Sequence, residues 1–158
     1  MIPPEERLAK ALSGGDRLVA VAESCTGGLI AHRITEVPGS SAYFDRGVVV
    51  YSNRAKVELL GVPEELLAAH GAVSEACARA MLEGLFAVTP ARLAAAVTGI
   101  AGPTGGSPEK PVGTVWLAWG SRDRRRVEHL WFPGSRSDVK QASAQAALER
   151  LAVAAEDR

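Results

Sequence analysis

The sequence predicts an α/β protein, a three-layer α/β/α sandwich around a central mixed, largely parallel sheet. Four short stretches are apolar almost throughout, which is typical of strands that helices cover on both faces: 18–22, 47–51, 93–97 and 112–119. Helical signals separate the first three stretches, and two strands then follow one another before a last helix. With 158 residues, 47% of them hydrophobic, the chain is expected to form a single domain over residues 1–158.

The first elements are expected to alternate between helix and strand. Apolar residues at helical spacing predict a helix around 8–12 and, after the strand at 18–22, a second helix over 30–37 that Pro38 and Gly39 end. The strand at 47–51 follows.

Two short helices are expected after this second strand. Asn53 is a candidate N-cap for a helix that runs through Leu60 and ends at Gly61. Pro63 and Glu64 start the next one, which closes at residues 70–71.

The clearest helix begins after Ser74, a candidate N-cap, and ends at Thr89 and Pro90. Its expected packing face is Cys77, Ala80, Met81, Gly84, Leu85 and Val88. Beyond the strand at 93–97 come a glycine-rich segment and two strands, 112–119 and 126–132. Ser137 and Asp138 are expected to open the last helix, with a packing stripe of Ala144, Leu148, Leu151 and Ala155.

Composition argues against several classes of function. The 18 basic and 18 acidic side chains cancel, so no nucleic-acid partner is expected. Two cysteines and three scattered histidines lack zinc-site spacing, so no metal is expected, and the cysteines fit free thiols in a reducing compartment. Neither a signal peptide nor a run of ~20 apolar residues is found, which indicates a cytoplasmic protein without a membrane partner.

Small and polar residues follow the first three strands. Ligands of parallel α/β sheets bind at the carboxyl ends of the strands, so segments 23–28, 51–56 and 98–106 are expected to line one crevice. A long loop in a compact domain is usually functional or disordered, which directs attention to residues 99–111.

The segment after the first strand contains a candidate nucleophile, Ser24. It leads into a helix, so its backbone N–H groups and the helix dipole predict an anion site, and Gly27 and Gly28 let a ligand approach closely. Alternatively, Ser24 or Thr26 only caps the helix. Glu23 either orients Lys56 or binds a ribose hydroxyl, or it simply complements the helix dipole.

Lys56 is the candidate base. If Asn53 is the N-cap, Lys56 occupies the third helical position, where the dipole disfavours a cation. A partly desolvated lysine there has a lowered pKa, as a general base for a serine hydroxyl requires. The alternative is that Lys56 extends into solvent. Tyr51 could donate its hydroxyl to the same group, stack on a ring, or merely pack.

Cys25 is a rival nucleophile. A thiol amidase needs an activating histidine, and none of the three histidines has a local relation to Cys25, so Ser24 is preferred. The glycine-rich loop would supply backbone donors and cover a substrate, with Lys110 as a possible anion contact, unless it is a flexible surface excursion.

At these residues the sequence resembles the CinA C-terminal domain family, whose members include stand-alone bacterial nicotinamide mononucleotide amidohydrolases. The resemblance covers nearly the whole chain and rests on AESCTGG at 22–28, GVVVYSNRAK at 47–56, GAVSE at 71–75, TGIAGPTGG at 98–106 and EKPVGTVW at 109–116. It implies a three-layer fold, a homodimer and no metal or organic cofactor. It also implies Ser24 as nucleophile, Lys56 as base and Tyr51 beside them. The pocket would include the TGIAGP segment, with Thr98, Gly99, Ile100, Ala101 and Gly102.

The function expected from this resemblance is hydrolysis of nicotinamide mononucleotide to nicotinic acid mononucleotide and ammonia, within pyridine-nucleotide recycling. The partner is then a small-molecule nucleotide. Family members often carry an N-terminal domain linked to pyrophosphate hydrolysis, and that second activity is not expected here. Two alternatives stay open: a non-catalytic nucleotide-binding or regulatory module, and an amidase that uses Cys25 or takes a related amide.

Overall fold

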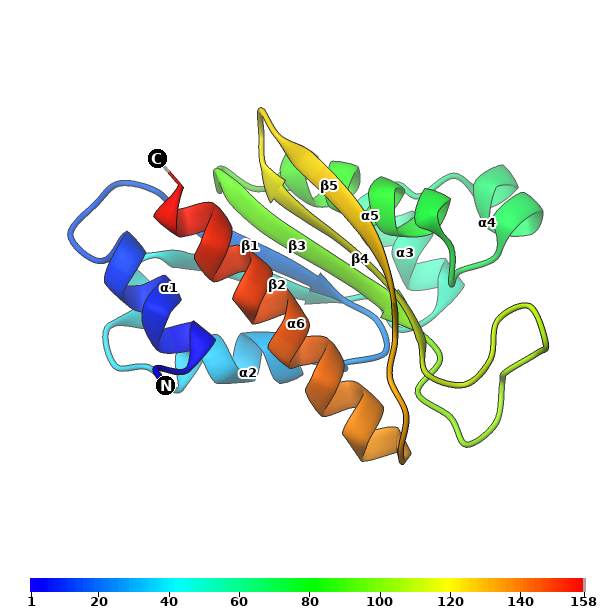
Figure 1. The fold of residues 1–158 in the computed structure, drawn as a ribbon. Coiled ribbons are helices and arrows are strands. Elements are labelled where there is room, and N and C mark those ends of the chain that lie inside the picture. Colours follow the sequence, from blue (N-terminus) through cyan, green and yellow to red (C-terminus); the bar gives the residue numbers. More distant parts are fainter. Residues whose placement is uncertain (158) are drawn as a thin grey trace.

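A computed structural model describes residues 1–157 and contains a five-stranded sheet between two layers of helices (Figure 1). The strands are β1 (Val19–Glu23), β2 (Phe44–Val49), β3 (Leu93–Gly99), β4 (Thr114–Ser121) and β5 (Arg125–Trp131). Their order is β2-β1-β3-β4-β5, with β1 parallel to β2 and β3, and β4 antiparallel to β3 and β5. The predicted α/β sandwich with a mixed, largely parallel sheet is confirmed.

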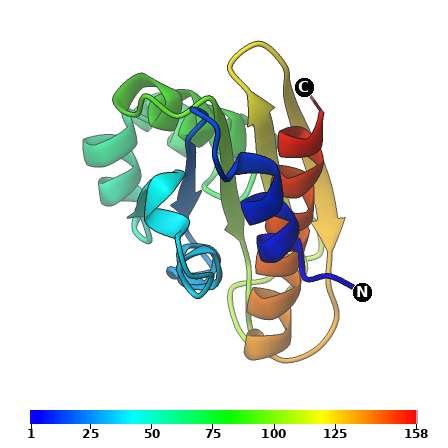
Figure 2. The ribbon, with the colours of Figure 1, turned by 90° about the vertical axis from the view of Figure 1, so that its left-hand side faces the viewer.

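One face of the sheet is covered by α1 (Pro4–Leu12), α2 (Leu29–Thr35) and α6 (Arg136–Glu156). Figure 2 shows α1 and α6 side by side on this face. The predicted stripe of α6 is confirmed, because all four of its side chains are fully buried: Ala144, Leu148, Leu151 and Ala155. They pack with apolar side chains of β1, β3 and β4 in one hydrophobic core.

The other face is covered by α3 (Asn53–Leu60), α4 (Glu64–His70) and α5 (Glu75–Val88), and a short 3-10 helix, η1 (Ser40–Ala42), precedes β2. Gly84 of α5 lets α3 approach closely, since a Cβ at this position would meet the Leu60 carbonyl oxygen at 1.8 Å. Cys77, Met81 and Leu85 of the predicted face of α5 are buried, but Val88 at its end is 46% exposed, so that part of the prediction is wrong.

The helix starts differ from the predictions by one or two positions. Ser52, not Asn53, caps α3, with its side chain accepting a hydrogen bond from the Ala55 N–H. Ser135, not Ser137, caps α6 in a capping box with Asp138. The predicted cap Ser74 of α5 is confirmed by its hydrogen bond from the Cys77 N–H.

The strand predicted at 47–51 as covered on both faces is instead the edge strand β2, which ends at Val49. No residue of β2 is fully buried, and Val49 at its end is 46% exposed; Tyr51, which lies beyond the strand, is 59% exposed. The parallel strands β1, β2 and β3 therefore end together at one edge of the sheet, and the residues beyond their ends lie close in space. Over residues 1–157, no helix is long and apolar enough to span a membrane.

Candidate active site

Two residues from different strand ends meet at this edge of the sheet. Ser24 follows β1, where its N–H donates to the Val97 carbonyl of β3, and Lys56 lies in the first turns of α3. The Lys56 Nζ lies 3.0 Å from the Ser24 Oγ. It also lies 2.9 Å from the carbonyl oxygen of Val50 and 3.2 Å from that of Tyr51. The strand ends and the helix start thus place a hydroxyl in hydrogen-bond contact with an amine.

The environment of Lys56 favours its neutral form. The side chain is 1% exposed, and its three partners are two carbonyls and a hydroxyl, with no carboxylate among them. Burial lowers the pKa of Lys56, because the ammonium form loses its hydration. The amine donates to the Ser24 Oγ and to the two carbonyls. Once it has lost a proton, its lone pair can instead accept the Ser24 O–H while its two hydrogens stay on the carbonyls. That is the geometry of a general base beside a serine nucleophile.

The position of Lys56 corrects the predicted reason for its lowered pKa. Because Ser52 is the N-cap, Lys56 is the fourth helical residue and not the third. The side chain turns into the protein core rather than remaining at the helix start, and desolvation is the main cause of the shift. The alternative of a solvent-exposed Lys56 is excluded.

Ser24 and Lys56 open into a small cavity of about 210 Å³. Its other lining residues are Cys25, Tyr51, Asn53, Ala72, Val73, Thr98, Gly99, Ala101 and Arg136. All three predicted strand-end segments contribute to it, as expected.

Backbone donors lie directly beside Ser24. Within residues 1–157 the N–H groups of Cys25 and Thr26 donate to no backbone carbonyl, whereas the Gly27 N–H is used in a turn to the Ser24 carbonyl. Free backbone N–H groups next to a nucleophile are suited to binding the oxyanion of a tetrahedral intermediate.

Tyr51 and Arg136 meet at the mouth of the cavity. The Tyr51 hydroxyl accepts a hydrogen bond from Arg136 at 2.8 Å, and the other guanidinium nitrogen donates to the Gly102 carbonyl at 2.7 Å. Tyr51 therefore lies at the site, but its hydroxyl contacts neither Ser24 nor Lys56. Arg136 is not among the residues predicted for the site, because it lies 85 residues from Tyr51 and follows no apolar strand.

The glycine-rich loop contributes only its first part to the cavity. Thr98, Gly99 and Ala101 line it, whereas Ile100 and Gly102 do not. Thr98 donates its hydroxyl to the Ala72 carbonyl at 2.9 Å and so fixes the opposite wall. The Lys110 amine donates to the His70 carbonyl at the end of α4, so it anchors the loop there and does not line the cavity.

The predicted anion site at the start of α2 is already filled by the protein itself. Glu23 is fully buried, and its two carboxylate oxygens accept hydrogen bonds from the backbone N–H groups of Ile30 and Ala31 at 2.9 and 3.0 Å. This favours the reading of Glu23 as the complement of the helix dipole, and it lies outside the cavity lining.

Thr26, Gly27 and Gly28 also lie outside the cavity lining. Gly27 and Gly28 have φ of +61° and +105°, so these glycines serve the turn between β1 and α2. The Thr26 hydroxyl is buried and has no hydrogen-bond partner in the described part of the chain.

Cys25 lines the cavity but lacks the properties of a nucleophile. Burial raises the pKa of its thiol to about 12, so the reactive thiolate is scarce near neutral pH. This observation favours Ser24 over Cys25.

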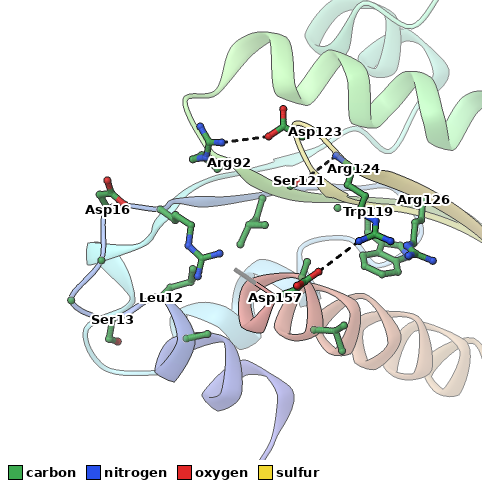
Figure 3. Close-up of a pocket in the computed structure, with 18 residues that line it drawn as sticks. Leu12, Ser13, Asp16, Arg92, Trp119, Ser121, Asp123, Arg124, Arg126 and Asp157 are labelled. Carbon is green, nitrogen blue, oxygen red and sulfur yellow. Dashed lines mark hydrogen bonds and ion pairs between the residues drawn. The ribbon is translucent and has the colours of Figure 1, made fainter.

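A larger cavity within residues 1–157, of about 830 Å³, lies at the opposite ends of these strands (Figure 3). Its arginines include Arg92, which pairs with Asp123, and Arg124, which pairs with Asp157. It contains no pair of a nucleophile and a base, so the smaller cavity at the strand ends is the candidate active site.

Comparisons with known proteins place this chain in a family. The family described as the CinA C-terminal domain matches residues 2–154. A Pseudomonas putida protein named nicotinamide-nucleotide amidohydrolase PncC is 52% identical over 145 residues, which are 92% of this chain and 91% of that protein. A CinA-like protein of Akkermansia muciniphila is 54% identical over 141 residues, which are 89% of this chain and 34% of that protein. The chain thus spans about a third of the length of several curated relatives.

Solved structures share the whole fold. A competence-damaged protein (CinA) superfamily protein from Klebsiella pneumoniae matches with a TM-score of 0.92 and 36% identity, covering 98% of this chain and 97% of that one. A competence/damage inducible protein from Agrobacterium tumefaciens matches with a TM-score of 0.90 and 42% identity, covering 97% and 96% of the two chains.

Proposed function

This chain belongs to the CinA C-terminal domain family, and from that premise we propose that it hydrolyses nicotinamide mononucleotide to nicotinic acid mononucleotide and ammonia. The observation that carries the proposal is the contact of 3.0 Å between a fully buried lysine amine and the Ser24 hydroxyl in a small cavity. The name of the Pseudomonas putida relative supports the choice of substrate.

In the proposed acylation step, the neutral Lys56 amine takes the proton of Ser24 while the Oγ attacks the carboxamide carbon. The N–H groups of Cys25 and Thr26 bind the oxyanion, an interaction typically worth about 3 to 4 kcal/mol per donor. The Lys56 ammonium then returns its proton to the departing nitrogen, so that ammonia leaves and an acyl ester on Ser24 remains.

In the proposed deacylation step, Lys56 acts as a base a second time. It takes a proton from a water molecule that attacks the ester carbon, and this proton passes to the Ser24 Oγ as the carboxylic acid leaves. The atoms balance as amide plus water gives acid plus ammonia, and no cofactor takes part. Tyr51, held by Arg136, forms the side of the cavity mouth where the pyridine ring enters.

The proposal places the reaction in the cytoplasm and in a homodimer of a single domain. Cys25 and Cys77 are both free thiols, which fits a reducing compartment. Sedimentation equilibrium on the purified protein is expected to give twice the chain mass of 16.6 kDa, and a monomer would contradict the homodimer.

Ammonia release from nicotinamide mononucleotide tests the function directly. We expect wild-type protein to release ammonia and nicotinic acid mononucleotide in equal amounts, and Ser24→Ala to lower kcat by ~10³-fold or more. Cys25→Ala is expected to retain most of the activity. If only Cys25→Ala loses ammonia release, Cys25 and not Ser24 is the nucleophile. If wild-type protein binds the mononucleotide but releases no ammonia, the chain is a nucleotide-binding module.

A further inference from the structure

The volume of the active-site cavity leaves part of the proposed substrate outside it. At about 210 Å³ the cavity is smaller than the ~300 Å³ at which sites begin to enclose whole drug-sized ligands. The carboxamide must reach Ser24 at the bottom, so the ribose and the 5′-phosphate extend past the mouth. The phosphate, which carries most of the charge of the substrate, then needs a partner on the surrounding surface.

The start of α2 does not supply that partner. The backbone N–H groups of Ile30 and Ala31 are taken by the Glu23 carboxylate. A phosphate placed there would meet a buried negative charge instead of free donors. The partner has to be sought on another element beside Ser24.

Lys140 of α6 lies over the turn that follows Ser24. Its Nζ would be 3.7 Å from a Cβ placed on Gly27, and the Gly27 N–H donates to the Ser24 carbonyl at 3.1 Å. The charge of Lys140 also acts on the thiol of Cys25, the residue next to Ser24. Lys140 stands one helical turn after Arg136, so both cations lie on the same side of α6.

The Lys140 amine is unpaired in the described part of the chain. The side chain is half-buried, and it makes no ion pair or hydrogen bond with any group of residues 1–157. The Lys110 amine, by contrast, is bound to the His70 carbonyl, and that of Lys56 to three oxygens. Lys140 is thus a half-buried cation without an anionic or hydrogen-bonding partner among these residues, so its amine is available to a ligand.

We propose that Lys140 binds the 5′-phosphate of the nucleotide substrate above the Gly27 turn, a subsite that selects nucleotides over nucleosides. This rests on the proposed function. Gly27 is exposed and has no side chain, so a phosphate can approach the amine over the bare backbone. The charge of the phosphate pairs with the otherwise unpaired ammonium, while Arg136 keeps its bonds to Tyr51 and Gly102.

The test compares two substrates that differ only in the phosphate, nicotinamide mononucleotide and nicotinamide riboside. Lys140→Ala is expected to raise KM for the mononucleotide about tenfold or more with little change in kcat, and to leave kcat/KM for the riboside unchanged. Lys140→Arg is expected to restore most of the affinity for the mononucleotide. Lys10→Ala, which removes one exposed cation from α1, is the matched control and is expected to alter neither substrate.

Equal losses with both substrates, or no change with either, would overturn the phosphate subsite. Calorimetric titration of Ser24→Ala and of Ser24→Ala/Lys140→Ala with both ligands separates this failure from that of the proposed function. If wild-type protein releases no ammonia, the amidohydrolase proposal fails. The subsite is still supported in that case if Ser24→Ala/Lys140→Ala binds the mononucleotide more weakly than Ser24→Ala does. Equal binding of the mononucleotide by both variants contradicts it.

Discussion

The chemistry of Lys56 follows from where its amine is held. An ordinary lysine keeps its proton to a pH of about 10.4 and has no lone pair to offer a serine near neutral pH. Burial lowers the pKa of Lys56, and two backbone carbonyls hold the amine toward Ser24. Burial thus removes water from the ammonium form of Lys56 and lowers its pKa, as a general base requires.

The pH dependence of activity is expected to report this pKa. Since only the neutral amine accepts the Ser24 proton, kcat/KM for ammonia release should rise with pH through the pKa of Lys56 and level off above it. The midpoint is expected below the ordinary lysine value of about 10.4. A midpoint at or above about 10.4, or a rate that falls as the pH rises through it, would contradict Lys56 as the base.

Stability is expected to depend on the same proton. Between the lowered folded-state pKa of Lys56 and about 10.4, the unfolded chain binds more protons than the folded one, so stability rises with pH across that window. In Lys56→Met this contribution is absent. The free energy of unfolding of wild-type protein minus that of Lys56→Met should therefore increase with pH there, as measured by urea unfolding. Titration of the cysteines occurs in both proteins and largely cancels, and a decreasing difference would rule out a lowered pKa.

At the scale of elements, the start of α6 positions Arg136 as the first helical residue. Ser135 and Asp138 form its capping box, so Ser135→Ala is expected to lower the free energy of unfolding by about 1 kcal/mol in urea unfolding. Ser137→Ala is the matched control, because this serine lies two residues further on and caps nothing, and its cost should stay within about 0.5 kcal/mol. Equal costs for the two variants would show that the cap is not at Ser135.

The sequence predicted the elements better than their ends. The apolar pattern of a helix or strand extends over many residues, whereas an N-cap depends on a single side chain. Neighbouring residues such as Ser52 and Asn53 can both accept the capping hydrogen bond, so the sequence does not decide between them. The edge position of β2 was missed because the apolar run at 47–51 resembles a central strand and only pairing distinguishes the two.

Within the site, Ser24 and Lys56 could be predicted because both follow strands that end at one edge of the sheet. Glu23 could not be assigned, since the same carboxylate suits a substrate or a helix start, and only its bonds to α2 decide between them. Arg136 reaches the cavity from the opposite end of the sequence, and no local pattern signals such a contact.

For the whole molecule, two hydrophobic core clusters cover the sheet, and one of them joins α1, α2 and α6 to it. Leu148 is fully buried in this cluster, so Leu148→Ala is expected to lower the free energy of unfolding by about 2 to 5 kcal/mol. Thermal unfolding followed by circular dichroism should show one transition at a lower temperature. A separate early transition for part of the molecule would contradict a shared core.

The pairing of α1 with α6 joins the first helix of the molecule to its last. During synthesis, α1 leaves the ribosome long before its partner exists, and the arginine at the mouth of the cavity is made only when α6 begins. A nascent chain that already holds both Ser24 and Lys56 therefore lacks one wall of the cavity into which they open. Premature termination before residue 136 would yield a polypeptide that has both residues but lacks the Arg136 side of the cavity mouth.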